Sequence, residues 1–141
     1  MLRRWLKFAI GEPPAPCLVQ AYVPHGQKTL RVVVIGTTTR SYWKVVQQPG
    51  RFGASLAQGA VIDTRTGPEL QAAGKEAVAD FCQKSGVDLA GFDLIFPEAS
   101  TRSRPLFLEI NYFFGRRGLG GSERFYEILE KEIRDWLVRA R

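Results

Sequence analysis

The fold is decided by two apolar stretches, Gly91-Phe92-Asp93-Leu94-Ile95-Phe96 and Phe107-Leu108-Glu109-Ile110-Asn111. Each is short, apolar and rich in strand-forming residues, so each predicts a β-strand. Side chains alternate along a strand, so Glu109 and Asn111 leave one face while the residue between them points to a core. If the two strands pair, the oxygens of Asp93, Glu109 and Asn111 converge on one patch. Three such ligands suit Mg²⁺, which completes its shell with waters and phosphate oxygens.

Other interpretations of these acidic residues stay open. A carboxylate at the end of a strand often caps a turn or meets a lysine. Asp93 and Glu109 both lie inside apolar stretches, where an unpaired charge is costly. Either a metal ion or a buried cation would offset that cost.

The size and composition of the chain indicate one globular domain. It has 141 residues, which is long enough to form a hydrophobic core. Of these residues 45% are hydrophobic and 24% are charged, a composition that is not typical of a disordered chain. The formal net charge is +6, but basic and aromatic residues are not interleaved as in RNA-binding segments. We therefore expect a pocket for phosphates or acidic substrates, and we do not expect a nucleic-acid partner.

Cysteine usage and hydropathy bear on the cellular compartment. Cys17 and Cys82 form no CxxC or zinc-ligand spacing, so we expect buried thiols in a reducing compartment. No apolar run approaches the length of a membrane span, and the N-terminal apolar stretch is too interrupted for a signal peptide. The expected location is the cytoplasm, without membrane contact.

The remaining pattern predicts an α+β domain. Residues 1–16 are a basic, proline-rich N-terminal segment, and residues 17–141 form the domain. Further strands are expected at 17–23, 30–35 and 41–47 with a turn at 36–40, helices at 68–85 and from a Ser122 cap to about 139, and glycine-rich basic loops at 49–59 and 115–121. Consecutive strands followed by single helices favour a largely antiparallel sheet flanked by helices over a doubly wound parallel sheet.

Five stretches, in this order, resemble the C-terminal half of the ATP-grasp ligases, most closely the branch that adds glutamate to a ribosomal protein. They are Leu-Val-Gln-Ala-Tyr-Val at 18–23, Leu-Arg-Val-Val-Val-Ile-Gly at 30–36, Gly-Arg-Phe-Gly-Ala-Ser-Leu at 50–56, Ala-Gly-Phe-Asp-Leu-Ile at 90–95 and Phe-Leu-Glu-Ile-Asn at 107–111. The resemblance implies an ATP-grasp C-terminal subdomain. It also implies a ligase that uses ATP and Mg²⁺ to activate a carboxylate as an acyl phosphate, which an amine or a thiol then attacks.

The resemblance assigns metal and nucleotide roles to particular residues. Asp93, Glu109 and Asn111 match the family's metal ligands. The segment at 20–23 matches the hinge whose backbone binds the adenine edge of ATP; its residues are Gln20, Ala21, Tyr22 and Val23. Lys44 is a further candidate for the nucleotide, against the alternative of an exposed lysine at a sheet edge.

Three arginines are candidates for catalysis. Arg31 matches an arginine of the corresponding family strand, so we expect it to contact phosphate or substrate. Arg116 and Arg117 lie in a glycine-rich loop before a helix, where they could grip a phosphate or a carboxylate substrate. A solvated basic turn is the alternative for these two.

The chain departs from the family pattern at several positions. Thr29 stands where the family has an acidic residue for the ribose, and Phe52-Gly-Ala-Ser55 lacks the arginine and asparagine of the family loop. The family's upstream subdomain, with its phosphate-binding lysines, has no counterpart in residues 1–16.

Three hypotheses follow. The chain is a catalytic half-domain of a ligase, a non-catalytic module that binds a nucleotide or docks a partner, or a half that a separate chain completes. Because an uncovered cleft exposes apolar surface, a homo-oligomer is also expected.

Overall fold

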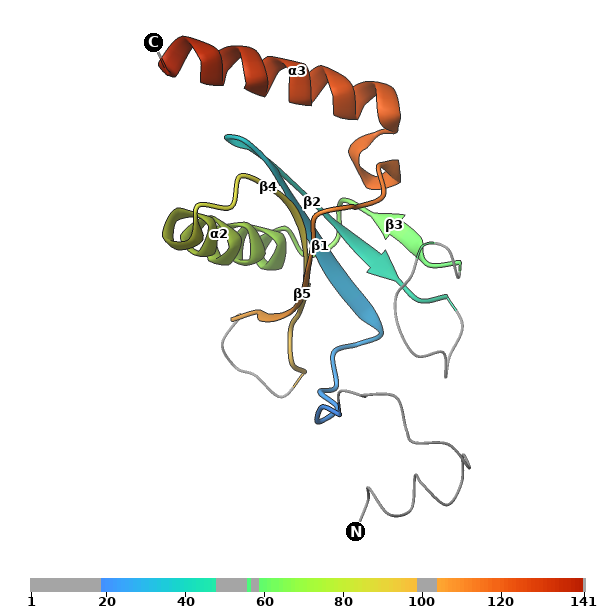
Figure 1. The fold of residues 1–141 in the computed structure, drawn as a ribbon. Helices are drawn as coiled ribbons and strands as arrows, with labels where there is room; N and C mark the ends of the chain where they lie inside the picture. The colour runs from blue at the N-terminus through green and yellow to red at the C-terminus, as the bar shows by residue number, and fades with distance from the viewer. Residues whose placement is uncertain (1–18, 48–55, 57–58, 99–103, 141) are drawn as a thin grey trace, which may run out of the picture.

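The computed structural model describes residues 19–47, 56, 59–98 and 104–140. The predicted α+β class is confirmed: one five-stranded antiparallel sheet in the order β3-β2-β1-β4-β5 is accompanied by two long helices (Figure 1). In chain order the elements are β1 (Lys28–Ile35), β2 (Thr38–Val45), β3 (Val61–Asp63), α2 (Pro68–Ser85), β4 (Leu89–Ile95), β5 (Leu106–Asn111), the 3₁₀-helix η2 (Arg117–Leu119) and α3 (Ser122–Arg139).

The hairpin β1–β2 turns more tightly than the sequence predicts. Ile35 pairs with Thr38, so the turn is only Gly36 and Thr37, and the predicted turn over 36–40 is wrong. Gly36 has φ 56°, a left-handed value at the first turn position, as in two-residue type II′ hairpins. Threonine is a good strand former, so β2 starts as soon as the chain has reversed.

The helix α2 covers one face of the sheet and matches its predicted bounds of 68–85. Pro68 opens it, and Gly86 ends it in a left-handed conformation with its N–H donated to the carbonyl of Cys82. Gly74 lets the helix lie close to β1, because a Cβ there would overlap the side chain of Leu30. The core on this α2 face consists of Leu30, Val32, Val34, Trp43, Val78, Ala90, Phe92 and Leu94.

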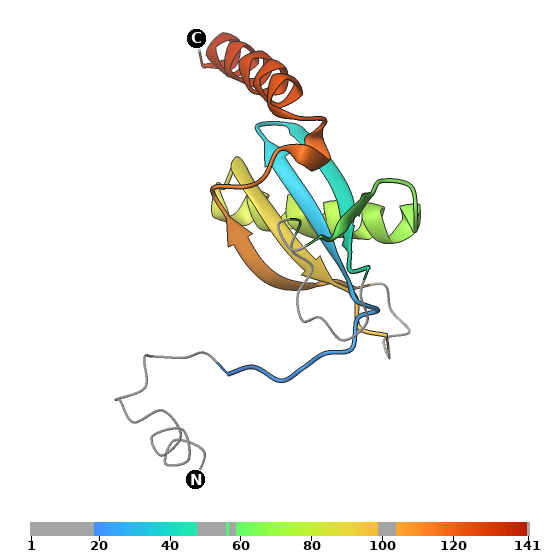
Figure 2. The same ribbon diagram turned by 90° about the vertical axis from the view of Figure 1, so that its right-hand side faces the viewer.

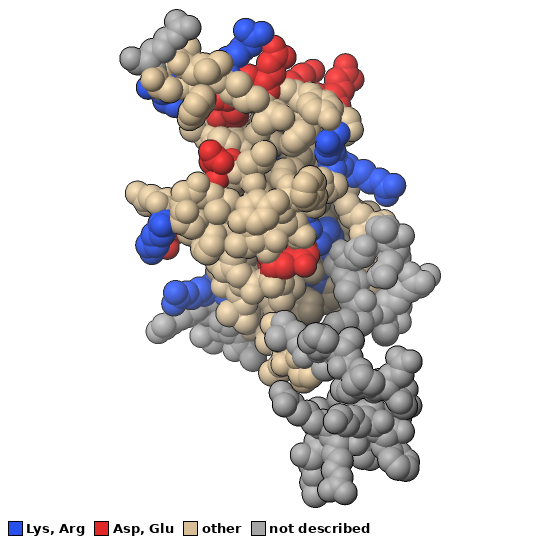
Figure 3. Space-filling view, viewed as in Figure 1, with Lys and Arg blue, Asp and Glu red and all other residues tan. Residues whose placement is uncertain are grey.

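The opposite face is covered at one end only. Phe125 and Ile128 of α3, with Leu119 of η2, pack on Val33, Ile35 and Tyr42. Figures 1 and 2 both show α3 beyond the end of the β1–β2 hairpin, on the side away from the N-terminus. Acidic and basic side chains are interspersed along α3 (Figure 3), where exposed ion pairs such as Arg134–Glu130 and Lys131–Asp135 form.

The apolar side of α3 is buried only in the first half of the helix. Ile133, Trp136 and Leu137 continue the apolar side that Phe125 and Ile128 begin, but these three are about half exposed, with Trp136 at 58%. The sheet ends beneath Glu132, so the helix continues beyond the surface that could cover it. The apolar period of a helix shows which side is apolar, and the length of the neighbouring sheet decides how much of it is buried.

A carboxylate joins α3 to the hairpin turn. Glu132 is 4% exposed and accepts hydrogen bonds from the Thr37 N–H at 2.8 Å and from the Thr38 hydroxyl at 2.6 Å. These bonds and the Thr37 hydroxyl lower the pKa of Glu132 to about 2, the Thr38 bond being the largest cause. The helix is therefore held by a charged hydrogen-bonded contact as well as by apolar packing.

Two predicted details at the ends of elements are wrong. Residues 19–23 form no strand: Val19 and Tyr22 are 71% and 64% exposed, and the segment leads away from the sheet (Figures 1 and 2). Ser122 is the first residue of α3, preceded by Gly121 without a side-chain cap. The N-terminal segment 1–16 and nearly all of the loop at 49–59 lie outside the described residues.

Candidate functional site

A row of polar side chains crosses the face that α3 leaves partly open. Tyr42, Arg31, Asp93 and Glu109 are direct register partners on β2, β1, β4 and β5. They share this face because the intervening residues of β1 and β4 belong to the α2-side core. The predicted pairing of the two strands is therefore confirmed, and Asp93 of β4 lies directly opposite Glu109 of β5.

Asp93 is held between two buried cations. Its Oδ1 accepts from Arg31 Nε at 2.5 Å, and its Oδ2 accepts from Arg31 Nη2 and Lys44 Nζ, both at 2.7 Å. The side chains of Arg31, Lys44 and Asp93 are 10%, 10% and 4% exposed. The sequence leaves a metal ion or a buried cation as the partner of this buried carboxylate. In the structure, the buried cations Arg31 and Lys44 offset its charge.

The pKa shifts follow from this arrangement. Burial by itself would raise the pKa of Asp93, but its hydrogen bonds to Arg31, and then Lys44, outweigh burial and lower it. Burial likewise opposes the charge of Arg31, while Asp93 and more weakly Glu109 raise its pKa. Burial raises the pKa of Tyr42 next to them. Asp93 and Arg31 thus both stay ionised at neutral pH.

Glu109 and Asn111 form the open end of the row. Both are on β5, and the Asn111 amide donates to Glu109 Oε1 at 3.0 Å. This leaves Glu109 Oε2 and Asn111 Oδ1 without a hydrogen bond to any described residue. These oxygens fit Mg²⁺ in chemical type, and Asp93 could join them if its cations released it. Among the described residues, no three His, Cys, Asp or Glu side chains gather as metal ligands.

The loop at 115–121 lies on the same sheet face as Asp93, and it contains the short helix η2. Gly118 sits on the ring of Tyr42, leaving no space for a Cβ, and Leu119 joins the α3-side core. The guanidinium of Arg116 stacks on Phe125 and Tyr126 of α3, 4.8 Å from each ring centre.

Neither loop arginine is brought into the polar row. Arg116 is held on α3, and Arg117 is exposed. The loop therefore lies next to the polar row through its backbone at Gly118, which contacts Tyr42, and not through its two arginines.

Lys44 is the residue that sequence reasoning undervalued. A five-residue turn at 36–40 would pair Arg31 with Val45 and put Lys44 on the face opposite Arg31. The two-residue turn shifts the register by an odd number, so Tyr42 faces Arg31 and Lys44 joins the same face. A two-residue turn that starts at Gly36 would have predicted the pairing of Arg31 with Tyr42, and with it the position of Lys44.

The predicted hinge residues Gln20, Ala21, Tyr22 and Val23 precede β1 outside the sheet. The segment is tied to the end of β4 by the Glu98 N–H, which donates to the Pro24 carbonyl at 2.9 Å. Within the segment, the carbonyl oxygen of Val23 lies 2.6 Å from Nδ1 of His25.

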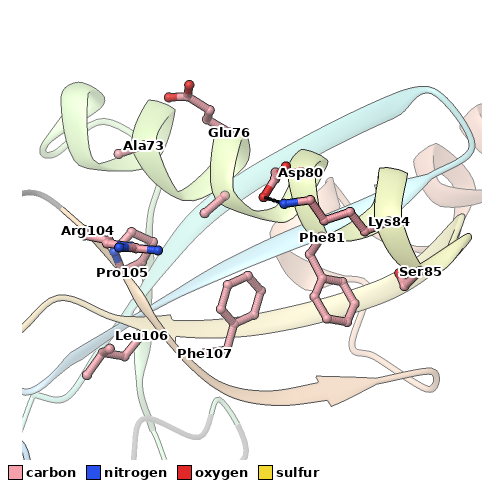
Figure 4. A pocket seen from close by; sticks show the side chains of 11 residues that line it. Ala73, Glu76, Asp80, Phe81, Lys84, Ser85, Arg104, Pro105, Leu106 and Phe107 are labelled. Carbon is pink, nitrogen blue, oxygen red and sulfur yellow. Dashed lines mark hydrogen bonds and ion pairs between the residues drawn. The ribbon is translucent and has the colours of Figure 1, made fainter.

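A separate groove lies between α2 and β5, on the other side of the sheet. Phe81 and Phe107 form its apolar floor, with ring centres 5.6 Å apart, while charged residues including Glu76 and Arg104 stand at its rim (Figure 4). Its volume is about 1110 Å³. None of the residues proposed for the site lines this groove.

Comparisons with known proteins leave the family undetermined. No family profile matches the chain, and no curated protein is similar in sequence. In the described residues, no helix has the length and apolar character needed to cross a membrane.

Proposed function

We propose that the chain is the metal- and nucleotide-binding half of an ATP-grasp-type carboxylate–amine or carboxylate–thiol ligase. The supporting observation is that Arg31, Lys44, Asp93 and Glu109 come together on one face of the sheet from four different strands. Cations for phosphates and oxygen ligands for a divalent cation are next to each other there. Such a pairing is what a phosphoryl-transfer site needs, because positioning and charge stabilisation supply most of the catalysis.

The proposed reaction uses the chain's own residues to hold anions. Arg31 and Lys44 bind phosphate oxygens of ATP and orient them toward a substrate carboxylate. The carboxylate oxygen attacks the γ-phosphorus, ADP leaves, and an amine or thiol then displaces phosphate from the acyl carbon. Mg²⁺, when bound at Glu109 and Asn111, would neutralise phosphate charge. Arg116 and Arg117 are proposed to meet the substrate only after a change in the loop, since Arg116 is stacked on α3.

The proposal includes partners and location. The hinge at 20–23 is assigned to adenine, and a separate chain or a further segment is proposed to supply the lysine-bearing subdomain of the family. The anionic substrate is a carboxylic acid, and the location is the cytoplasm.

A non-catalytic module is the second candidate function. It is favoured by one observation: the positive charges of Arg31 and Lys44 are balanced by the negative charges of Asp93 and Glu109 on the same face. A nucleotide-binding or partner-docking domain would keep such a self-contained cluster.

Metal and nucleotide binding separate the ligase from a module that only docks a partner. We expect millimolar Mg²⁺ with ADP to raise the melting temperature of the wild-type protein, and Glu109→Gln to abolish most of this shift. Glu109 is exposed and bonds only to Asn111 among the described residues, so this variant should fold normally. The matched control is Glu76→Gln, an exposed glutamate of α2 on the other side of the sheet. If the wild-type protein shows no shift in melting temperature and calorimetry also detects no binding, the ligase proposal is replaced by the partner-docking module.

A further inference from the structure

The carboxylate of Asp93 occupies the position that an anionic ligand would take. Arg31 presents two N–H groups to both of its oxygens, at 2.5 and 2.7 Å, and Lys44 adds a third contact at 2.7 Å. A fork of two donors with an adjacent ammonium is the arrangement that proteins use for carboxylate and phosphate ligands. The cations are thus preorganised for an oxyanion, and the chain's own side chain fills the place.

This occupancy makes phosphate binding and metal binding interfere in the free protein. A phosphate cannot take the three N–H groups of Arg31 and Lys44 that Asp93 already occupies. A divalent cation at Asp93 would lie against two positive groups that are 90% buried. At such exposure, repulsion between like charges is only weakly screened by solvent. Each ligand alone therefore meets an unfavourable site.

We propose that the two ligands bind by exchange, and this rests on the proposed function. A phosphate-type oxyanion replaces Asp93 on Arg31 and Lys44. The released Asp93 carboxylate then joins Glu109, its register partner on β5, and Asn111 as a ligand to the divalent cation. Each ligand removes the obstacle to the other, so each raises the other's affinity by the same factor. Asp93 is then a switch residue that links the anion site to the cation site.

The anion half of this inference is tested without metal. Asp93→Ala removes the internal anion and leaves two buried cations, so inorganic phosphate should bind the variant at least about tenfold more tightly than wild type. Calorimetry and melting temperature with chelator present are the measurements. The control is Asp80→Ala, which frees the exposed Lys84 from its ion pair and should gain no phosphate affinity. If Asp93→Ala does not fold in phosphate-free buffer, Asp93→Asn keeps the shape and is measured instead. Equal phosphate affinity in wild type and the Asp93 variant overturns the inference.

The coupling is tested in wild type with Mg²⁺ and pyrophosphate. Mg²⁺ affinity should rise at least about tenfold at saturating pyrophosphate, after correction for the complex that the two form in solution. Glu109→Gln should lose this gain, and Glu76→Gln should keep it. Equal Mg²⁺ affinity with and without pyrophosphate overturns the exchange and leaves the proposed function standing. No response to Mg²⁺ in either condition overturns the proposed function, and the anion site is then judged by the Asp93 variants alone.

Discussion

The two faces of the sheet are built on different principles. The α2 face is an apolar core in which Gly74 brings helix and sheet into close contact. The opposite face has an apolar core only under Phe125 and Ile128, and then continues as the row of charges around Asp93. On the first face stability depends on packed volume, whereas on the second each buried charge depends on keeping its partner. This difference predicts that the faces respond to substitution in different ways.

The largest loss is expected on the α2 face. Phe92 is 0% exposed and contacts the rings of Phe81 and Phe107, so Phe92→Ala should lower the free energy of unfolding by about 4 kcal/mol. Urea denaturation measures the effect. Phe113→Ala is the control, because Phe113 is 99% exposed and its loss should be nearly neutral. Similar losses for both variants would contradict the assignment of the core.

A smaller loss, and one that can be reversed, is expected in the charged row. Arg31→Met leaves Asp93 with Lys44 alone and should cost about 3 kcal/mol. The triple variant Arg31→Met, Lys44→Met, Asp93→Leu removes all three charges and should recover most of this stability. No recovery in urea denaturation would show that the charges are needed for folding itself.

The contact between α3 and the hairpin should depend on pH. The pKa of Glu132 is about 2 in the folded protein, below its ordinary value of 4.5. Its contribution is therefore complete above pH 4.5 and is lost as the pH falls from there toward 2. Glu132→Gln should cost about 2 kcal/mol at pH 7 and progressively less below pH 4.5. A constant difference between the two proteins across this range would show that Glu132 is not the titrating group.

The smallest expected effect concerns the loop over Tyr42. A Cβ at Gly118 would overlap the Tyr42 ring, so Gly118→Ala should cost about 1 kcal/mol by displacing η2. Gly115→Ala is a matched control, because nothing lies within 4 Å of its Cβ position. Near-ultraviolet circular dichroism of the tyrosine environment and urea denaturation would detect the displacement. Equal behaviour of the two variants would place η2 away from Tyr42.

The elements with strong local signals were predictable from sequence. Pro68 and Gly86 mark the ends of α2, and the apolar alternation around Asp93 and Glu109 gives their strands. The three-residue strand β3 has too little pattern of its own and is held by pairing with β2. The buried partners of Asp93 depend on register, which one turn residue decides. The local sequence pattern does not show whether the register is shifted by an odd or an even number of residues. It therefore cannot predict which face of the sheet carries Lys44.

The order of the strands gives the site an uneven stiffness. Strand β1, with Arg31, is hydrogen-bonded on both sides, and so is β4, with Asp93, whereas β5 has a neighbour on one side only. Backbone amides of β1 should therefore exchange with solvent deuterium more slowly than those of β5, which can open without the rest of the sheet. A ligand bridging Asp93 and Glu109 would connect an edge strand to an interior strand of the sheet. Its binding would be recorded as slower deuterium uptake in β5, while β1 would change little.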